Sequence, residues 1–254
     1  MLFLLVVNHI YRASLNPLIK KEENGPKESL KSLFTEMLKL SILVFAELIF
    51  FNLFRVVNMW LYIKTTLETE HKGKIIQYLG SYHGKVLILT GIAILIILTF
   101  SGRNSRRVQR LYFKNDYKSC WKYFMEDIKQ IVIMGLPFVI IFALPAKQIM
   151  TLLYKTAGNT EITMLQIGSI NIILIPIAIY IYRLLRKMNL RLIIILIPSI
   201  AFISQTILMS VIVKLPAIGA LALIISEVSF WAFIVILELL VALKTLKQGY
   251  KSKI

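Results

Sequence analysis

Two glutamates are the only charged residues in the apolar segment 215–243, and both have side chains that can carry protons. Glu227 and Glu238 are eleven residues apart. On an α-helix this spacing places them about 16 Å apart and about 20° from a common face. A titratable carboxyl group at that depth is a candidate for coupling proton movement to a conformational change. The alternative is a buried, protonated glutamate that only makes hydrogen bonds.

A second apolar segment, 37–63, carries Glu47, Arg55 and Asn58. Glu47 and Arg55 are about 12 Å apart along a helix and rotated by about 80°, so they cannot form a direct ion pair. Asn58 lies about 20° from the face of Glu47, which predicts a polar stripe with Arg55 beside it. The stripe indicates either the wall of a hydrophilic cavity or polar contacts between helices, or an Arg55 that extends toward water. Glu227 is a candidate partner of Arg55 if the two segments are neighbours.

Enzyme chemistry is not indicated by the remaining reactive residues. No zinc-protease, nucleophile-elbow or phosphate-loop motif occurs, and Cys120 is the only cysteine. The three histidines, His9, His71 and His83, are scattered along the chain and predict no metal site. We therefore expect no catalytic residue, no metal and no cofactor.

The composition shows what kind of structure must position these groups. The chain has 254 residues, of which 57% are hydrophobic and 17% charged. Soluble domains carry about 45–50% apolar and about 25% charged residues. The apolar residues are also gathered into runs near the 20 residues or so that cross a bilayer. The sequence therefore predicts an all-α, multi-pass membrane protein.

Six runs predict six membrane-spanning helices. Their approximate bounds are 37–63, 85–102, 130–146, 163–182, 192–213 and 215–243. Three prolines lie inside the predicted spans and are candidates for helix kinks: Pro137, Pro176 and Pro198.

A further helix is predicted between the second and third spans. Trp121, Phe124, Met125 and Ile128 follow the i, i+3, i+4, i+7 spacing of one apolar helix face. Residues 118–129 are therefore expected to form a helix that lies in the membrane interface or links the spans on the cytoplasmic side.

The distribution of basic residues predicts the orientation. Of 30 lysines and arginines, 22 fall on one side of the predicted spans and 7 on the other. Because cytoplasmic loops collect basic residues, both termini are expected in the cytoplasm. Loop charge of this origin explains the net charge of +17 without a nucleic-acid partner. Residues 33–245 would form the membrane lobe, between residues 1–32, which begin with the end of a preceding helix, and a basic tail at 246–254.

Several motifs in the second half of the chain occur in the order typical of one transporter family. In segment 135–177 they are Pro137, Pro145, Ile149, Leu152, Leu153 and Tyr154. Segment 215–233 adds Gly219 and Ala220 at the entry of the last span, and the basic loop contains Lys114, Asn115 and Asp116. Together these features resemble the MOP flippase superfamily, and most closely its polysaccharide and stage V sporulation protein B branch.

The resemblance implies the C-terminal six-helix lobe of a MATE-like transporter in the bacterial cytoplasmic membrane. Such a lobe would flip lipid-linked oligosaccharide or polysaccharide precursors by alternating access. Arg55, the only basic residue deep in a span, would face the pyrophosphate of this substrate. A single lobe would need membrane lipids around it and either a missing N-terminal lobe or a second copy as its partner. The alternatives are a multidrug or cation extruder of the same fold and a truncated membrane protein without transport.

Overall fold

The computed structural model describes most of the chain from Arg55 onward. The described ranges are 55–67, 72–102, 104–155, 158–188, 190–215 and 218–251, and every regular element in them is helical. Residues 54–254 form one compact unit. The predicted all-α class is confirmed for these ranges. Glu47, His9, His71 and most of the predicted span 37–63 lie outside the described residues.

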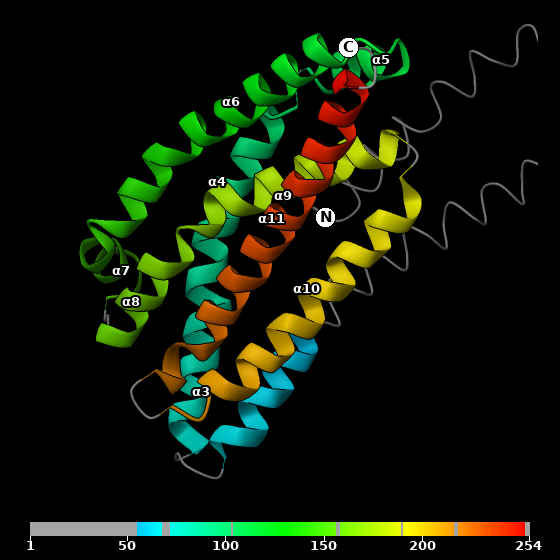
Figure 1. The fold of residues 1–254 in the computed structure, drawn as a ribbon. Coiled ribbons are helices and arrows are strands. Elements are labelled where there is room, and N and C mark those ends of the chain that lie inside the picture. The colour runs from blue at the N-terminus through cyan, green and yellow to red at the C-terminus, as the bar shows by residue number, and fades with distance from the viewer. Residues whose placement is uncertain are drawn as a thin grey trace, which may run out of the picture. The chain divides into compact units, whose positions relative to one another are not determined.

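The described helices follow one another with short connections (Figure 1). The first of the described helices covers residues 55–66. The later elements are α3 (Lys72–Ser81), the π-helical turn η1 (Tyr82–Val86), α4 (Leu87–Phe100), α5 (Ser105–Phe113), α6 (Tyr117–Ala143), α7 (Ala146–Tyr154), α8 (Asn159–Gly168), α9 (Asn171–Lys187), α10 (Arg191–Ile212), the 3₁₀ turn η2 (Gly219–Leu221) and α11 (Ala222–Lys251).

Four stretches of the described helices are long and apolar enough to cross a membrane. They are Ile75–Phe100, Asn159–Lys187, Ile195–Ile212 and Gly219–Leu246. The pair α6 and α7 makes a fifth if its two helices, which meet at 71°, form one broken span. A multi-pass membrane protein is therefore compatible with the described part of the chain, whereas the predicted number of six spans stays a prediction.

Helix α9 lies at the centre of the bundle and packs against α4, α6 and α11, while α10 packs mainly on α11 (Figure 1). Burial agrees with this arrangement. In the most apolar part of Asn159–Lys187, 50% is buried inside the bundle, compared with only 28% in Ile195–Ile212. The outer face of α10 is formed by large aliphatic side chains such as Ile195, Ile203 and Ile207, each about 60% exposed. An exposed aliphatic face of this length is suited to lipid rather than water.

The predicted boundary between an interfacial helix at 118–129 and a span at 130–146 is not present, because α6 is continuous from Tyr117 to Ala143. Its buried face keeps one helical register through both parts. The buried residues are Cys120, Phe124, Asp127, Ile131 and Gly135. Of the apolar stripe predicted at 121–128, only Phe124 is fully buried. A helix over 118–129 is thus confirmed, but it is the first half of a longer one.

Other spans are shifted at their ends. The second begins earlier, because α3, η1 and α4 join in one helical stretch, Ile75–Phe100. The last helix continues to Lys251, beyond the predicted end at 243. Only α10 has nearly the bounds predicted for its span, 192–213.

All three predicted proline positions lie inside helices: Pro137 in α6, Pro176 in α9 and Pro198 in α10. Their role as kinks stays a prediction. The 71° bend between α6 and α7 falls instead at Pro145, the residue that precedes the first turn of α7. Proline suits this place because it lacks the N–H that an inner helical position would need.

Two glycines allow helices to approach closely. A Cβ atom at Gly135 of α6 would lie 2.6 Å from Cγ1 of Ile173 on α9. A Cβ atom at Gly168 would lie 2.9 Å from Ile224 of α11 and 3.0 Å from Val86. Small residues at helix contacts are a common means of packing helices in membranes, because lipid tails offer little hydrophobic drive for association.

Replacing Gly135 by alanine is expected to lower the free energy of unfolding by about 1–3 kcal/mol, because the added methyl group overlaps Ile173. Gly91→Ala in α4 is the matched control, since a Cβ atom at Gly91 meets no atom within 4 Å. This control should keep or slightly raise stability, as alanine favours the helix. Thermal unfolding of both variants in one detergent, followed by circular dichroism, measures the difference. Equal melting temperatures would contradict the close contact of α6 and α9.

Candidate functional site

Glu227 is the centre of a polar contact between three segments that are far apart in the chain. Its side chain is 1% exposed and comes from α11. The hydroxyl group of Tyr82, in η1, donates to its Oε2 atom at 2.6 Å. Nη2 of Arg55 donates to its Oε1 atom at 3.5 Å, which forms an ion pair. The predicted pairing of Arg55 with Glu227 is therefore observed.

Arg55 is the exposed member of this contact, with 47% of its side chain accessible. A guanidinium group has five N–H donors, and the pair with Glu227 engages one nitrogen. Asn58, three residues along the same helix, is buried, and within the described part of the chain its Oδ1 atom has no hydrogen-bond partner. The structure thus places Arg55 and Asn58 on one helix but in different environments.

The π-helical turn η1 explains how one short segment serves two acidic partners. Tyr82 faces Glu227 of α11, whereas Ser81 and Lys85 face Glu161 of α8. A π-turn adds one residue to the helical repeat and re-aims the side chains around it, and such turns occur often at functional sites. Here Tyr82 and Lys85 of η1 donate to glutamates on two different helices.

The second contact is centred on Glu161, which the sequence analysis did not select. Nζ of Lys85 lies 2.9 Å from its Oε1 atom and 3.0 Å from its Oε2 atom. The hydroxyl group of Ser81 donates to Oε1, and the N–H of Gly158 donates to Oε2 at 3.4 Å. Glu161 and Lys85 lie at the ends of two apolar runs that the predicted orientation would place on one side of the membrane. This shared side was the signal available in the sequence.

Glu238 is buried, at 2% exposure, and its Oε2 atom has no hydrogen-bond partner among the described residues. Burial of both Glu227 and Glu238 agrees with the common helix face predicted from their spacing. The same spacing, about 16 Å along α11, keeps Glu238 outside the contact of Glu227 with Arg55. Their role in coupling stays a prediction.

Asp127 of α6 is a third buried acid, and it too was missed. It is 0% exposed, and its Oδ1 atom accepts the N–H of Asn104 at 3.3 Å. The hydroxyl group of Tyr180 on α9 also interacts with this carboxylate. The sequence analysis placed residue 127 in a surface helix, so its position on the buried face of a longer helix was not foreseen.

Histidine and metal chemistry receive no support from the described part of the chain. His83 contacts the ring of Tyr82 edge to face, with 4.7 Å between ring centroids. Within the described ranges no three His, Cys, Asp or Glu side chains lie close enough together to hold a metal ion.

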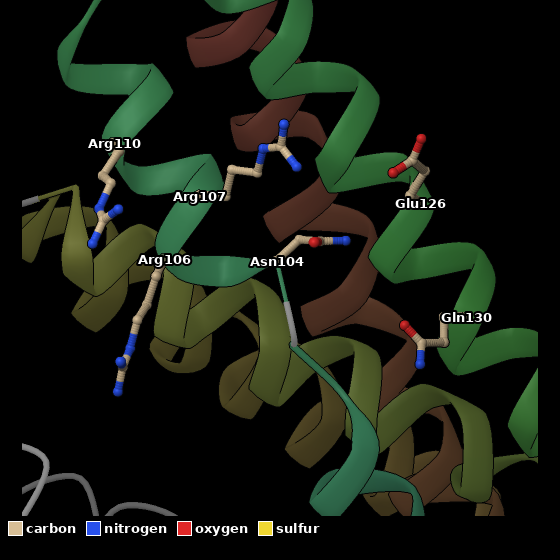
Figure 2. A pocket seen from close by; sticks show the side chains of 6 residues that line it. All are labelled: Asn104, Arg106, Arg107, Arg110, Glu126 and Gln130. Atoms are coloured by element: carbon tan, nitrogen blue, oxygen red, sulfur yellow. The ribbon is translucent and has the colours of Figure 1, made fainter.

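A cavity of about 800 Å³ lies apart from these contacts, between α5 and α6 (Figure 2). It is lined by Asn104, Arg106, Arg107, Arg110, Glu126 and Gln130. None of the residues predicted as substrate or coupling sites lines it. The contact of Arg55 with Glu227 and this cavity are therefore two separate candidate sites.

Comparison of the chain with protein-family models, curated proteins and solved structures found no match. The resemblance to the MOP superfamily therefore rests on the sequence motifs alone.

Replacing Lys85 by methionine is expected to lower the free energy of unfolding by about 1–3 kcal/mol, because Glu161 then keeps a buried charge without its cation. The double variant Lys85→Met/Glu161→Gln should recover part of this loss. Lys147→Met, at an exposed site on α7, is the matched control. Thermal unfolding in one detergent compares the three variants. A Lys85→Met protein as stable as the control would contradict a stabilising ion pair.

Proposed function

We propose that the chain is half of a membrane transporter that flips lipid-linked oligosaccharide or polysaccharide precursors across the cytoplasmic membrane by alternating access. The observation that carries the proposal is the half-exposed Arg55 cation held against buried Glu227. Ionisable side chains in apolar spans are costly to insert and commonly mark a substrate or ion path. The family resemblance of the sequence supplies the substrate class.

The chemistry of the Arg55 contact suits a diphosphate group. Guanidinium groups bind phosphate oxygens through paired hydrogen bonds, and Arg55 keeps donors free of Glu227. The contact with Glu227, at 3.5 Å, is long for a charged hydrogen bond, so a diphosphate can compete for the same cation. Tyr82 would continue to hold the Glu227 carboxylate at 2.6 Å while Arg55 turns to the substrate.

Alternating access needs a second lobe. In transporters built from two related lobes, the substrate site lies near the mid-plane of the membrane, between them. We propose that an N-terminal lobe or a second copy of this chain completes the cavity opposite Arg55. The exposure of Arg55, at 47%, leaves its guanidinium accessible to such a cavity.

Arg55→Gln is expected to weaken the binding of a polyprenyl-diphosphate-linked sugar by about tenfold or more, because charge-assisted hydrogen bonds to the diphosphate are lost. Binding to the full chain in nanodiscs measures this effect, with the uncharged polyprenol as the comparison ligand. Lys64→Gln is the matched control on the same helix, since Lys64 is exposed and stacks over Trp60.

Flipping is then measured in proteoliposomes with a fluorescent analogue of the same lipid and a quencher that does not cross membranes. Wild-type protein should speed the loss of the protected fluorescence, and Arg55→Gln should not. Equal binding by wild type and Arg55→Gln, or equal affinity for the diphosphate lipid and the polyprenol, would contradict the proposal.

A second candidate function, export of organic cations, is favoured by the two buried carboxyl groups of α11, Glu227 and Glu238. Cells that express the chain should then resist cationic dyes, and Glu227→Gln should abolish this resistance because the site loses its negative charge. Growth at graded dye concentrations measures the effect. Resistance that persists in Glu227→Gln, or is never conferred, would exclude this alternative.

A further inference from the structure

The groove between α5 and α6 is basic on one wall. Arg106, Arg107 and Arg110 of α5 line it together with Glu126 of α6, and Figure 2 shows Arg107 extending toward the α6 side. Within the described ranges none of the three arginines forms an ion pair with a carboxylate. The groove therefore presents more positive than negative charge, and no described acid neutralises its cations.

Contacts with the rest of the bundle fix the position of α5, which forms the basic wall of the groove. Gly102, with a φ of +79°, turns the chain after α4, and a Cβ atom there would lie 3.5 Å from the ring of Tyr180. Buried Asp127 accepts the N–H of Asn104 at 3.3 Å. Val108, at 0% exposure, anchors α5 to the bundle from its inner face. Because α5 is fixed in this way, its arginines start from a defined position.

Tyr123 orients one arginine of the groove, and Lys187 adds a positive charge near α5. The guanidinium carbon of Arg107 lies 3.9 Å from the centroid of the Tyr123 ring, a cation–π contact that orients its side chain. Lys187, at the end of α9, donates from Nζ to Ser105 at 3.0 Å, which brings another cation beside the first turn of α5. An oriented arginine thus lines the groove, and a further cation, Lys187, lies beside the first turn of α5.

The groove lies where apolar spans end. Helix α5 begins five residues after Phe100, the last residue of the apolar stretch Ile75–Phe100, and Lys187 ends the stretch Asn159–Lys187. Phe113, at the end of α5, is 58% exposed, and its ring contacts Tyr112. Exposed aromatic rings are typical of the level of lipid headgroups. The arginines are therefore placed at the depth of phospholipid phosphates.

We propose that the groove between α5 and α6 binds the phosphate of an anionic phospholipid headgroup through Arg106, Arg107 and Arg110. Basic pockets between membrane helices on the cytoplasmic side are suited to anionic headgroups. The amide side chains of Asn104 and Gln130 line the same groove and offer neutral donors for the glycerol or phosphate oxygens. The site is separate from Arg55 and does not depend on the proposed transport.

The test measures the dissociation constants of phosphatidylglycerol and phosphatidylcholine from the full chain by native mass spectrometry. Wild-type protein should bind phosphatidylglycerol more tightly. The variant Arg106→Gln/Arg107→Gln/Arg110→Gln should weaken this binding by about 100-fold, since each of the three arginines at the surface contributes about fivefold. The matched control, Lys114→Gln/Lys118→Gln/Lys122→Gln, removes the same charge at exposed residues outside the groove and should change it less than about threefold.

A gain-of-binding variant makes the test independent of any loss of folding. Glu126→Gln removes the acid from the groove and should tighten phosphatidylglycerol binding several-fold. Equal weakening by the arginine and lysine variants, or no preference for phosphatidylglycerol, would overturn the proposal. Displacement of the lipid by millimolar inorganic phosphate would assign the groove to free phosphate and overturn the lipid assignment.

Discussion

A carboxylate inside the apolar bundle must be met by donors, and this requirement ties the described helices to one another. Removing such a charge from water costs several kcal/mol unless hydrogen bonds and an opposite charge replace the hydration. The π-helical turn η1 supplies donors to two of these acids, Glu227 through Tyr82 and Glu161 through Lys85. The turn therefore joins α11 and α8, and a movement of η1 would affect both carboxylates together.

The same requirement acts at the α5 end of the bundle. There Asp127 receives the N–H of Asn104, and this contact fixes the turn that starts α5. Within the described ranges the buried Oε2 atom of Glu238 has no hydrogen-bond partner, which costs free energy.

Packing and solvation divide the helices between two roles. Helix α9 is surrounded by α4, α6 and α11, and Gly135 allows α6 to approach it closely. Helix α10 contributes less to the core and turns Ile195, Ile203 and Ile207 outward. The central helices can therefore support polar contacts that a lipid-facing helix could not satisfy. Candidate sites follow the same division, since Glu227 and Asp127 come from α11 and α6, which pack on α9.

Composition and periodicity predicted the helical class and most of the helices. Long apolar runs separated by basic loops are typical of helices that cross a bilayer, because every backbone polar group must be paired there. Spacing alone also placed Glu227 and Glu238 on one buried face, since the period of a helix depends on no other segment. The pairing of Arg55 with Glu227 followed as a hypothesis that depended on which helices are neighbours.

The remaining features of the fold and of the candidate sites depend on how distant segments pack together. The burial of Asp127 could not be predicted, because it depends on α6 continuing beyond residue 129. The apolar stripe at 121–128 has the same pattern whether it faces a membrane interface or another helix. The π-turn at η1 and the contact of Lys85 with Glu161 depend on atoms brought together from distant segments, and local pattern carries no record of them. The bend at Pro145, rather than at the prolines inside the spans, likewise reflects where the packed bundle leaves room for the chain to turn. The period of the sequence determines which residues share a helix face, whereas packing determines which residues of other helices they contact.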